Sequence, residues 1–505
     1  MKKCNYFLLL LVFGVMGSCS DLVEEPVGLL APDGFFTTTE DINTAANAAY
    51  GNMIHEDFWG RKMSLTLMLR GDMVAIGDPT TSSRRIEHDD FNVPADNGMI
   101  DGYWLRTYQI IAAANAAIDG ANDVDVSDEI KNPITARAYF ARAFTYFHLV
   151  RQFGDIPYLS ERIRDLEAAS AISRTPAADV YANIIADLEF AEEWLPNTQV
   201  SRSIPAKSAA SSYLALVHLT MGNHQAAYDK AKEVIDNEGT YDLALQEDYQ
   251  ELYDASLIES SKEPLFTLDH IGASDGDDGR DYQAALTGLR DDEQYNLGGG
   301  WSVAVPSLEV YNTWDGRDYR KSVSLDTTGV FDGVTQPFSV FRESGAGRGV
   351  NRPHIAKYTR RIGQTATGNG RGSNTNYSMM RYAEVLLIAA EALNEVAPGS
   401  AEADGYVNRV RARARNGNGS DFPSDVSGMS QDEFRSMVLE ERKWELAFEF
   451  KRWYDIARTR TGAEVFSASG LEGAKPNFDP AQDYLFPLPA DELARNPNLT
   501  QNPGY

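Results

Sequence analysis

The feature that most restricts the fold of this chain is a pair of neighbouring segments with helical periodicity, residues 205–221 and 223–237. Such a pair favours folds built from antiparallel helices. Alanines alternate there with large apolar residues at helical spacing, and Gly222 lies between the two segments. Small residues let two helices approach closely, and a glycine permits the tight turn that joins them. Because this pattern is typical of the tetratricopeptide hairpin, we predict that the two segments form one.

The same helical signal recurs on both sides of this pair. Residues 430–460 begin with Ser430 and Glu433 in the arrangement of a capping box, and an apolar face follows. The other segments with apolar residues at helical spacing are 39–54, 101–119, 132–152, 176–195, 378–397 and 402–415. We therefore predict a mainly α fold, with tetratricopeptide-like hairpins over about 39–54, 101–237 and 378–460.

Helical periodicity fails in two long stretches, residues 55–100 and 239–376. Glycine, aspartate, asparagine and arginine dominate the second stretch, which favours loops and short strands. Long stretches without regular helices in a helical protein are usually functional or form a small subdomain. We predict that residues 39–505 form a single domain, in which a helical scaffold supports a loop-rich, short-strand, ligand-binding half.

The N-terminus reads as a lipoprotein signal peptide over residues 1–18. Lys2 and Lys3 precede an apolar run that is too short to span a bilayer, and Gly17 and Ser18 lead into Cys19. We expect cleavage before Cys19 and acylation of that cysteine, with residues 19–38 as a lipidated tether. The mature chain would then form no disulfide, since its single cysteine carries lipid. An ordinary secretory peptide is the alternative.

The charge balance and the missing motifs exclude several functions. The chain has 74 acidic and 46 basic residues, a net charge of −28, which disfavours nucleic acids and anionic lipid surfaces as partners. Membrane contact is expected only through the N-terminal lipid. No zinc-protease motif, nucleophile elbow, phosphate loop or cysteine nucleophile is present. We therefore predict no catalytic residues and no enzymatic activity.

Four ordered blocks of distinctive sequence lie near the C-terminus, at residues 381–392, 407–414, 440–458 and 484–505, and residues 142–157 form a fifth. Together these segments resemble the SusD/RagB family of surface glycan-binding lipoproteins. The resemblance implies a SusD-like fold and binding of oligosaccharide or polysaccharide. It also implies a SusC-like TonB-dependent outer-membrane transporter as partner. The acidic stretch after Cys19 resembles a surface-export signal, which implies a lipid-anchored protein on the outer face of the outer membrane.

A glycan site needs flat aromatic rings and planar hydrogen-bonding groups, and both kinds gather in the two loop regions. The first region also contains Arg70, Arg85, His88 and Asn97, and the second Tyr282, Asn296, Tyr311 and Trp314. The five residues that we predict to bind glycan are Trp59, Asp72, Arg84, Tyr295 and Trp301. Core packing is the alternative for the tryptophans.

A local excess of basic residues raises the alternative of an anionic glycan. Between residues 342 and 371 the chain has seven basic side chains and one acid, Glu343. Guanidinium groups bind carboxylates and sulfates well, so this stretch could bind a uronic-acid or sulfated glycan. Alternatively, its arginines pair with the acids that are in excess elsewhere, or face the transporter.

Acidic residues elsewhere in the chain could suggest a metal or a catalytic pair. The run 275–281 fails as an EF-hand, since Leu286 occupies the position that needs a glutamate. A structural calcium ion stays open, but a solvated acidic turn is favoured, so we predict no cofactor and no metal. Glu384, Glu391 and Glu395 lie one or two helical turns apart. We expect them to form salt bridges with arginines of neighbouring helices, namely Arg409, Arg411 and Arg442.

Two functions from other classes compete with glycan binding. The first is a surface glycoside hydrolase with an all-helical fold, which would need two opposed carboxylates in a cleft. The second is a tetratricopeptide adaptor for protein partners, which predicts a polar concave groove without exposed aromatic residues.

Overall fold

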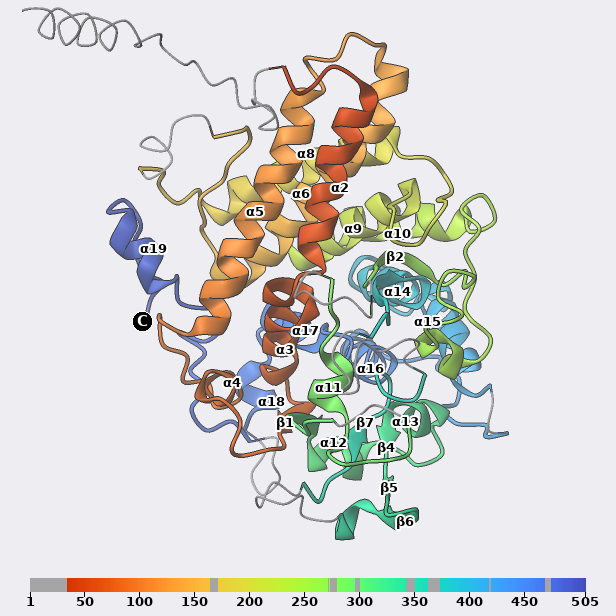
Figure 1. Cartoon of the computed structure of the whole chain (residues 1–505). Helices are drawn as coiled ribbons and strands as arrows, with labels where there is room; N and C mark the ends of the chain where they lie inside the picture. Colours follow the sequence, from red (N-terminus) through yellow and green to blue (C-terminus); the bar gives the residue numbers. More distant parts are fainter. Residues whose placement is uncertain are drawn as a thin grey trace, which may run out of the picture.

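The computed structural model describes residues 34–163, 171–270, 272, 279–295, 300–341, 350–361, 373–416, 419–467 and 474–505. Long helices stand side by side at the top of Figure 1, and most of the labelled short strands gather towards the bottom, whereas β2 lies at mid-height beside α14. The fold is mainly α, as predicted. The predicted signal peptide, Cys19 and most of the tether lie outside the described residues. Within the described chain, no helix combines the length and apolar character needed to cross a membrane.

The N-terminal half is a series of antiparallel helices in contact with their neighbours. Helix α2 packs on α5, α5 on α6, α6 on α8, α8 on α9, and α9 on α10. Fully buried alanines such as Ala46 and Ala114 allow the close approach. The predicted hairpin at 205–237 is confirmed, with Gly222 at positive φ in its turn. The helices are α2 (Thr39–Met53), α5 (Gly98–Gly120), α6 (Asp128–Phe153), α8 (Ala177–Trp194), α9 (Lys207–Thr220) and α10 (His224–Asp236).

The C-terminal helices continue this arrangement, because α14 packs against α10 and then against α15 and α16. The predicted capping box is present, with Ser430 and Glu433 bonded reciprocally. The helices are α14 (Tyr382–Val396), α15 (Ala401–Ala414), α16 (Gln431–Glu445), α17 (Arg452–Thr459), α18 (Gly462–Val465) and α19 (Ala490–Arg495).

Two predicted helix bounds at the C-terminal end are wrong. Residues 378–381 belong to a strand, β8 (Tyr377–Arg381), which pairs antiparallel with β2 (Pro264–Leu268). The predicted helix 430–460 is interrupted between α16 and α17, where Phe448 and Phe450 have positive φ. Both rings are buried in the core, so tertiary packing overrides the helical pattern there.

The stretch 55–100 is more helical than we predicted. It contains a π-helix, η1 (Glu56–Gly60), then α3 (Lys62–Leu69), β1 (Val74–Ile76) and α4 (Ser83–Asp89). Helix α3 is buried on all sides from Met63 to Leu69. A helix without a polar face shows no amphipathic periodicity, which is why the sequence pattern does not reveal it.

The described part of the stretch 239–376 contains loops and short strands, as predicted, and also short helices that we did not predict. In the described part of the chain the strands form four two-stranded antiparallel sheets, β1–β3, β2–β8, β4–β7 and β5–β6. The strands of this stretch not yet given are β3 (Ala304–Pro306), β4 (Leu325–Asp326), β5 (Thr328–Phe331), β6 (Val334–Pro337) and β7 (His354–Ile355). Its short helices are η2 (Tyr249–Tyr253), α11 (Gln283–Thr287), α12 (Leu308–Thr313), α13 (Tyr319–Ser324) and η3 (Phe338–Val340).

Candidate functional site

The pairing of β1 with β3 brings the two loop-rich stretches together. Val74 lies opposite Pro306 and Ile76 opposite Ala304. The backbone contact continues beyond the strands, where the N–H groups of Gly77 and Asp78 donate to the carbonyl oxygens of Val303 and Ser302, both at 2.8 Å. The segment that leads into α4 therefore lies beside the segment that carries Trp301, although more than 200 residues separate them in the sequence.

Two glycines make this close approach possible. A Cβ atom on Gly77 would collide with the carbonyl oxygen of Ser302, and one on Gly300 would collide with the backbone of Gly288. Backbone hydrogen bonds then fix the turn around Trp301, whose N–H donates to the carbonyl oxygen of Ala285 at 2.6 Å. The Trp301 ring is thus held on a rigid backbone.

Four side chains form a continuous row at this junction. The Arg85 guanidinium lies 6.0 Å from the Trp301 ring, and the Trp301 and Tyr282 ring centroids are 6.0 Å apart. The Arg61 guanidinium lies 4.8 Å from the Tyr282 ring. We call Arg61, Tyr282, Trp301 and Arg85 the aromatic–arginine strip. Tyr282 is buried, whereas the other three side chains are half-buried and can contact a ligand.

The strip carries positive charge. Burial lowers the pKa of Arg85 to about 10, and the positive charges of Arg61 and Arg84 act in the same direction. Arg85 donates to the Thr81 hydroxyl at 2.9 Å, and no carboxylate of the described chain lies within ion-pair distance of it. The nearby acids are already bound, Glu56 by Arg61 and Asp78 by Arg290. A partly exposed ring beside an arginine without a carboxylate partner can stack on a sugar and bind its hydroxyl or acid groups.

Two of the five predicted glycan-binding residues fall in this region. Trp301 belongs to the strip, and Arg84 is half-buried on α4 next to Arg85. Tyr282 and Arg85 are in the wider loop-region sets but not among the five, and Arg61 is in neither. Nothing in the sequence distinguishes Arg85 from Arg84, because only the orientation of α4 decides which guanidinium faces Trp301.

Trp59 and Asp72 are wrong predictions, because neither side chain is available to a ligand. Trp59 is 1% exposed, and its ring packs against His148 and Phe450, with centroids 5.0 and 5.3 Å away. Asp72 is buried, and its carboxylate accepts two hydrogen bonds from Arg452 of α17, at 2.7 and 2.9 Å. Burial opposes ionisation of Asp72, but the charge of Arg452 outweighs it and holds the pKa below its usual range.

Tyr295 belongs to a different group of contacts from the strip. Its ring packs on Ala284, and its hydroxyl donates to Asp326 at 3.0 Å. The same carboxylate binds Arg360, so the polar end of Tyr295 is already satisfied. Trp314, by contrast, is a core residue that stacks on Trp444, with ring centroids 4.7 Å apart.

The described part of the basic stretch favours the alternative in which its cations pair with acids. Lys357 binds Glu449 at 2.8 Å, and Arg361 binds Asp254 at 2.9 Å. Arg360 is engaged with Asp326 as above. Arg342, Arg348 and Arg371 lie outside the described residues. The stretch therefore offers fewer ligand-binding cations than its sequence suggests.

The acidic run 275–281 lies mostly outside the described residues, and only its last three positions can be placed. There Asp281 is fully buried and accepts a hydrogen bond from the Ser373 hydroxyl at 2.5 Å. Burial raises its pKa to about 7. Among the residues that the structure places, no group of three or more histidine, cysteine or acidic side chains is arranged to hold a metal ion.

Charged residues of the C-terminal blocks and of the stretch 239–376 form a buried ion cluster. Glu445 is completely buried and binds Arg320 at 3.0 Å, Arg381 at 2.5 Å, and Arg413. The members of this buried ion cluster are Asp318, Arg320, Lys357, Arg381, Arg413, Glu263, Glu441, Glu445 and Glu449. The blocks thus supply scaffold contacts.

The predicted salt bridges from α14 to neighbouring helices are present, but only Arg442 of the three predicted partners takes part in them. Arg409 binds Glu238 instead, and Arg411 binds Glu441. Glu384 binds Arg442 at 3.2 Å, Glu391 binds Arg458, and Glu395 binds Arg435 at 2.7 Å. These carboxylates hold helices together, in agreement with the packing interpretation.

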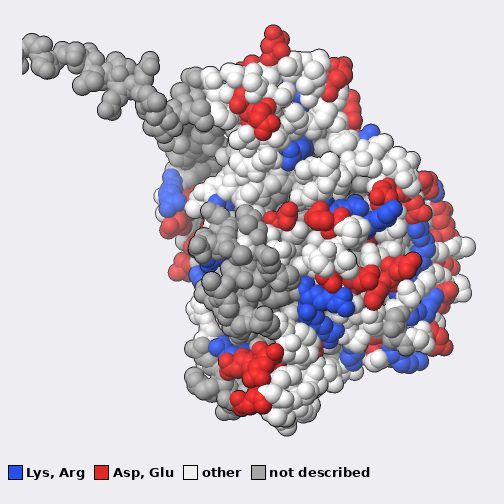
Figure 2. Space-filling model, turned by 45° about the vertical axis from the view of Figure 1, so that its right-hand side comes forward, with Lys and Arg blue, Asp and Glu red and all other residues white. Residues whose placement is uncertain are grey.

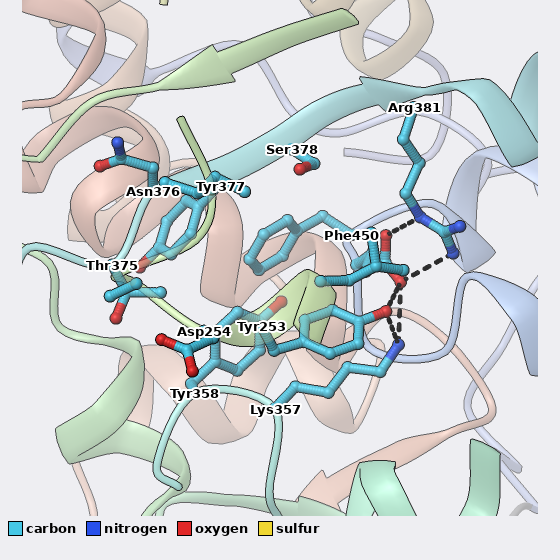
Figure 3. A pocket seen from close by; sticks show the side chains of 14 residues that line it. Tyr253, Asp254, Lys357, Tyr358, Thr375, Asn376, Tyr377, Ser378, Arg381 and Phe450 are labelled. Carbon is cyan, nitrogen blue, oxygen red and sulfur yellow. Dashed lines mark hydrogen bonds and ion pairs between the residues drawn. The ribbon is translucent and has the colours of Figure 1, made fainter. Parts of the chain in front are cut away.

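A small pocket borders the buried ion cluster and is shown in Figure 3. Lys357 reaches the Tyr253 hydroxyl and Glu449 there, and Tyr358, Tyr377 and Phe450 supply aromatic walls. Its free volume is only about 30 Å³, whereas ligand pockets usually measure roughly 300–1,000 Å³. This pocket can hold about one water molecule and is too small for a sugar.

The outer surface mixes charges of both signs. Figure 2 shows basic and acidic groups next to one another across one face, without a broad patch of a single sign. This distribution agrees with the many ion pairs between exposed side chains, such as Lys232 with Glu402 and Lys262 with Asp242.

Comparisons with known proteins find family matches in both halves of the chain. Residues 342–505 match the model of the SusD family, and residues 40–219 match a model described as starch-binding and associating with the outer membrane. A relative from Formosa agariphila, SusD-like protein P2, is 53% identical over the full length of both chains. A SusD-like protein from Bacteroides ovatus is 22% identical over 97% of this chain and 96% of its own.

Solved structures show the same fold. A SusD homologue from Bacteroides thetaiotaomicron superimposes with a TM-score of 0.81 at 20% identity, covering 94% of this chain and 98% of its own. A laminarin-binding SusD-like protein superimposes with a TM-score of 0.77 at 24% identity, covering 93% of this chain and all of its own. The fold therefore extends over nearly the whole described chain.

Proposed function

Because this chain belongs to the SusD family, we propose that it binds oligosaccharide or polysaccharide at the outer cell surface, without catalysis, and passes it to a SusC-like TonB-dependent transporter. The observation that carries the proposal is the aromatic–arginine strip, where Trp301 and Arg85 are half-buried and Arg85 lacks a carboxylate partner in the described chain. Lipid anchoring through Cys19 belongs to the same proposal.

The composition of the strip supports binding without hydrolysis. A glycoside hydrolase needs two carboxylates roughly 5–10 Å apart on either side of the scissile bond, one of them free to protonate the leaving group. At the strip, Glu56 and Asp78 are each bound to an arginine, with the Asp78–Arg290 bond at 2.9 Å. The partly exposed Trp301 ring also supports sugar binding over a protein adaptor role, which would use a polar groove.

Affinity electrophoresis tests the binding proposal. The soluble protein beginning after Cys19 would be run through gels that contain neutral or anionic polysaccharides, with released reducing ends assayed in parallel. We expect retardation by at least one glycan without new reducing ends. Trp301→Ala and Arg85→Gln should each weaken binding by at least about tenfold, because aromatic and arginine residues dominate interface energies.

A matched control separates the strip from general effects of removing a tryptophan. Trp194 is half-buried at the end of α8 in the helical half, where it packs near Phe190. Trp194→Ala should therefore leave retardation unchanged. Glycan binding that survives in both strip variants, or new reducing ends in the parallel assay, would contradict the proposal.

The transporter and the anchor need a separate test in native outer membranes. The full chain, carrying a C-terminal tag, should co-purify with a TonB-dependent transporter after mild detergent extraction. Cys19→Ala should release the protein from the membrane fraction and abolish this co-purification, since the acyl chains provide the attachment. Recovery of the wild-type protein without any such transporter would contradict the partner assignment.

A further inference from the structure

A second pocket lies in the helical half and shares no residue with the aromatic–arginine strip. Helices α6, α8, α9 and α17 and the segment at Tyr484 line it, and its free volume is about 320 Å³, within the size range of small-ligand sites. Three arginines and three tyrosines stand among its lining residues, Arg151, Arg458, Arg460, Tyr181, Tyr454 and Tyr484.

The charge of this pocket contrasts with that of the whole chain. None of its lining residues is acidic, although the chain has 74 acidic residues and a net charge of −28. Arg458 is neutralised by Glu391 and Asp455. Arg151 and Arg460 have no carboxylate within ion-pair distance in the described chain, so they leave the pocket with uncompensated positive charge.

Aromatic contacts hold both of these arginines in place. The Arg151 guanidinium lies 3.7 Å from the Phe147 ring and 3.5 Å from the Tyr454 ring, and its Nε donates to the carbonyl oxygen of Phe147 at 3.0 Å. Arg460 follows α17 in the left-handed conformation, and its guanidinium lies 4.4 Å from the Tyr484 ring. Arg151 Nη2 also lies 3.1 Å from His148 Nδ1. Stacking leaves the remaining guanidinium N–H groups of the two arginines available to an acceptor.

We propose that this pocket is a second binding site, for a single anionic sugar unit that bears a carboxylate or a sulfate. Arg151 and Arg460 bind the anionic group, and the half-buried Tyr181 ring contacts the sugar ring. This site goes beyond the glycan binding assigned to the strip and does not depend on it. It also assigns anion recognition to a part of the chain other than the basic stretch at 342–371.

Isothermal titration at low salt tests the site with three probes, glucuronate, glucose and inorganic sulfate. We expect glucuronate to bind at least about tenfold more tightly than glucose, because each charge-assisted hydrogen bond contributes appreciably to affinity. Sulfate, which lacks a ring, should bind more weakly than glucuronate. Equal affinity for glucose and glucuronate, sulfate binding as tight as glucuronate, or no glucuronate binding would overturn the proposal.

Variants locate the binding within the protein. Arg460 is exposed, so Arg460→Gln should keep the fold and weaken glucuronate binding about tenfold. Ala177→Trp should block the pocket from α8 and abolish binding. Because Arg151 packs between two rings, Arg151→Gln is used only if its melting temperature is unchanged. The control Arg495→Gln, at an exposed arginine of α19, should bind normally. Wild-type affinity in Arg460→Gln and Ala177→Trp would overturn the assignment.

Discussion

Replacing Glu445 by glutamine should destabilise the protein more than any exposed charge change. Glu445 is completely buried and is shared by Arg320, Arg381 and Arg413, with Nη1–carboxylate distances of 3.0 Å to Arg320 and 2.5 Å to Arg381. The three positive charges hold the pKa of Glu445 below its usual range even though burial opposes ionisation. Removing one partner of a buried ion pair costs roughly 3–5 kcal/mol, because the remaining charges stay buried without compensation.

The measurement is the melting temperature of Glu445→Gln by differential scanning fluorimetry. At about 2 °C per kcal/mol for a large domain, the expected fall is roughly 6–10 °C. Glu402→Gln is the matched control, because Glu402 binds Lys232 at 3.1 Å with both side chains well exposed. Such surface pairs contribute at most about 1 kcal/mol. If both variants melt within about 2 °C of the wild type, the buried ion cluster does not hold the scaffold together.

The remaining predictions concern the core, the strip backbone and acid stability. Trp59→Ala should lower the free energy of unfolding by roughly 3–5 kcal/mol, measured by denaturant titration, because its ring is fully buried; an unchanged midpoint would contradict this. Gly77→Ala should weaken glycan retardation as Trp301→Ala does, because its Cβ would collide with the Ser302 carbonyl. The pKa values of Glu449 and Asp455 are lowered to about 2, so the stability that they contribute is present above about pH 4.5 and lost as the pH falls towards 2. Thermal melts over that range should show a decline that is shallower in Glu449→Gln.

The helical scaffold could be predicted because its helices are amphipathic and carry local signals. The Ser430–Glu433 capping box is formed by residues that are close together in the sequence. The same holds for the small residues within the hairpin at 205–237. Helix α3 escaped detection because Met63 to Leu69 are all buried and no polar face marks it. The break at Phe448 and Phe450 escaped because contacts with distant core residues, not local propensity, set their positive φ.

The individual site residues could be predicted only in part, because residue type does not reveal burial. Trp59 and Trp301 have the same chemistry and both lie in loop-rich stretches. The first is enclosed by His148 and Phe450, whereas the second is left partly exposed beside the β1–β3 ladder. That ladder joins segments more than 200 residues apart, so no local pattern could show that Arg85 lies beside Trp301.

In a chain with this excess of acidic residues, the basic side chains that best indicate a ligand site are those without a carboxylate partner. Most arginines that attract attention in the sequence are neutralised, including Arg360 of the basic stretch and Arg381 of the buried ion cluster. An arginine that stays unpaired among so many carboxylates has been kept away from them by the fold, at a cost in favourable electrostatics. In the described chain Arg85, Arg151 and Arg460 are such residues, and each stands against an aromatic ring. This shared combination of unpaired charge and aromatic surface is why both the strip and the second pocket are assigned to sugar ligands.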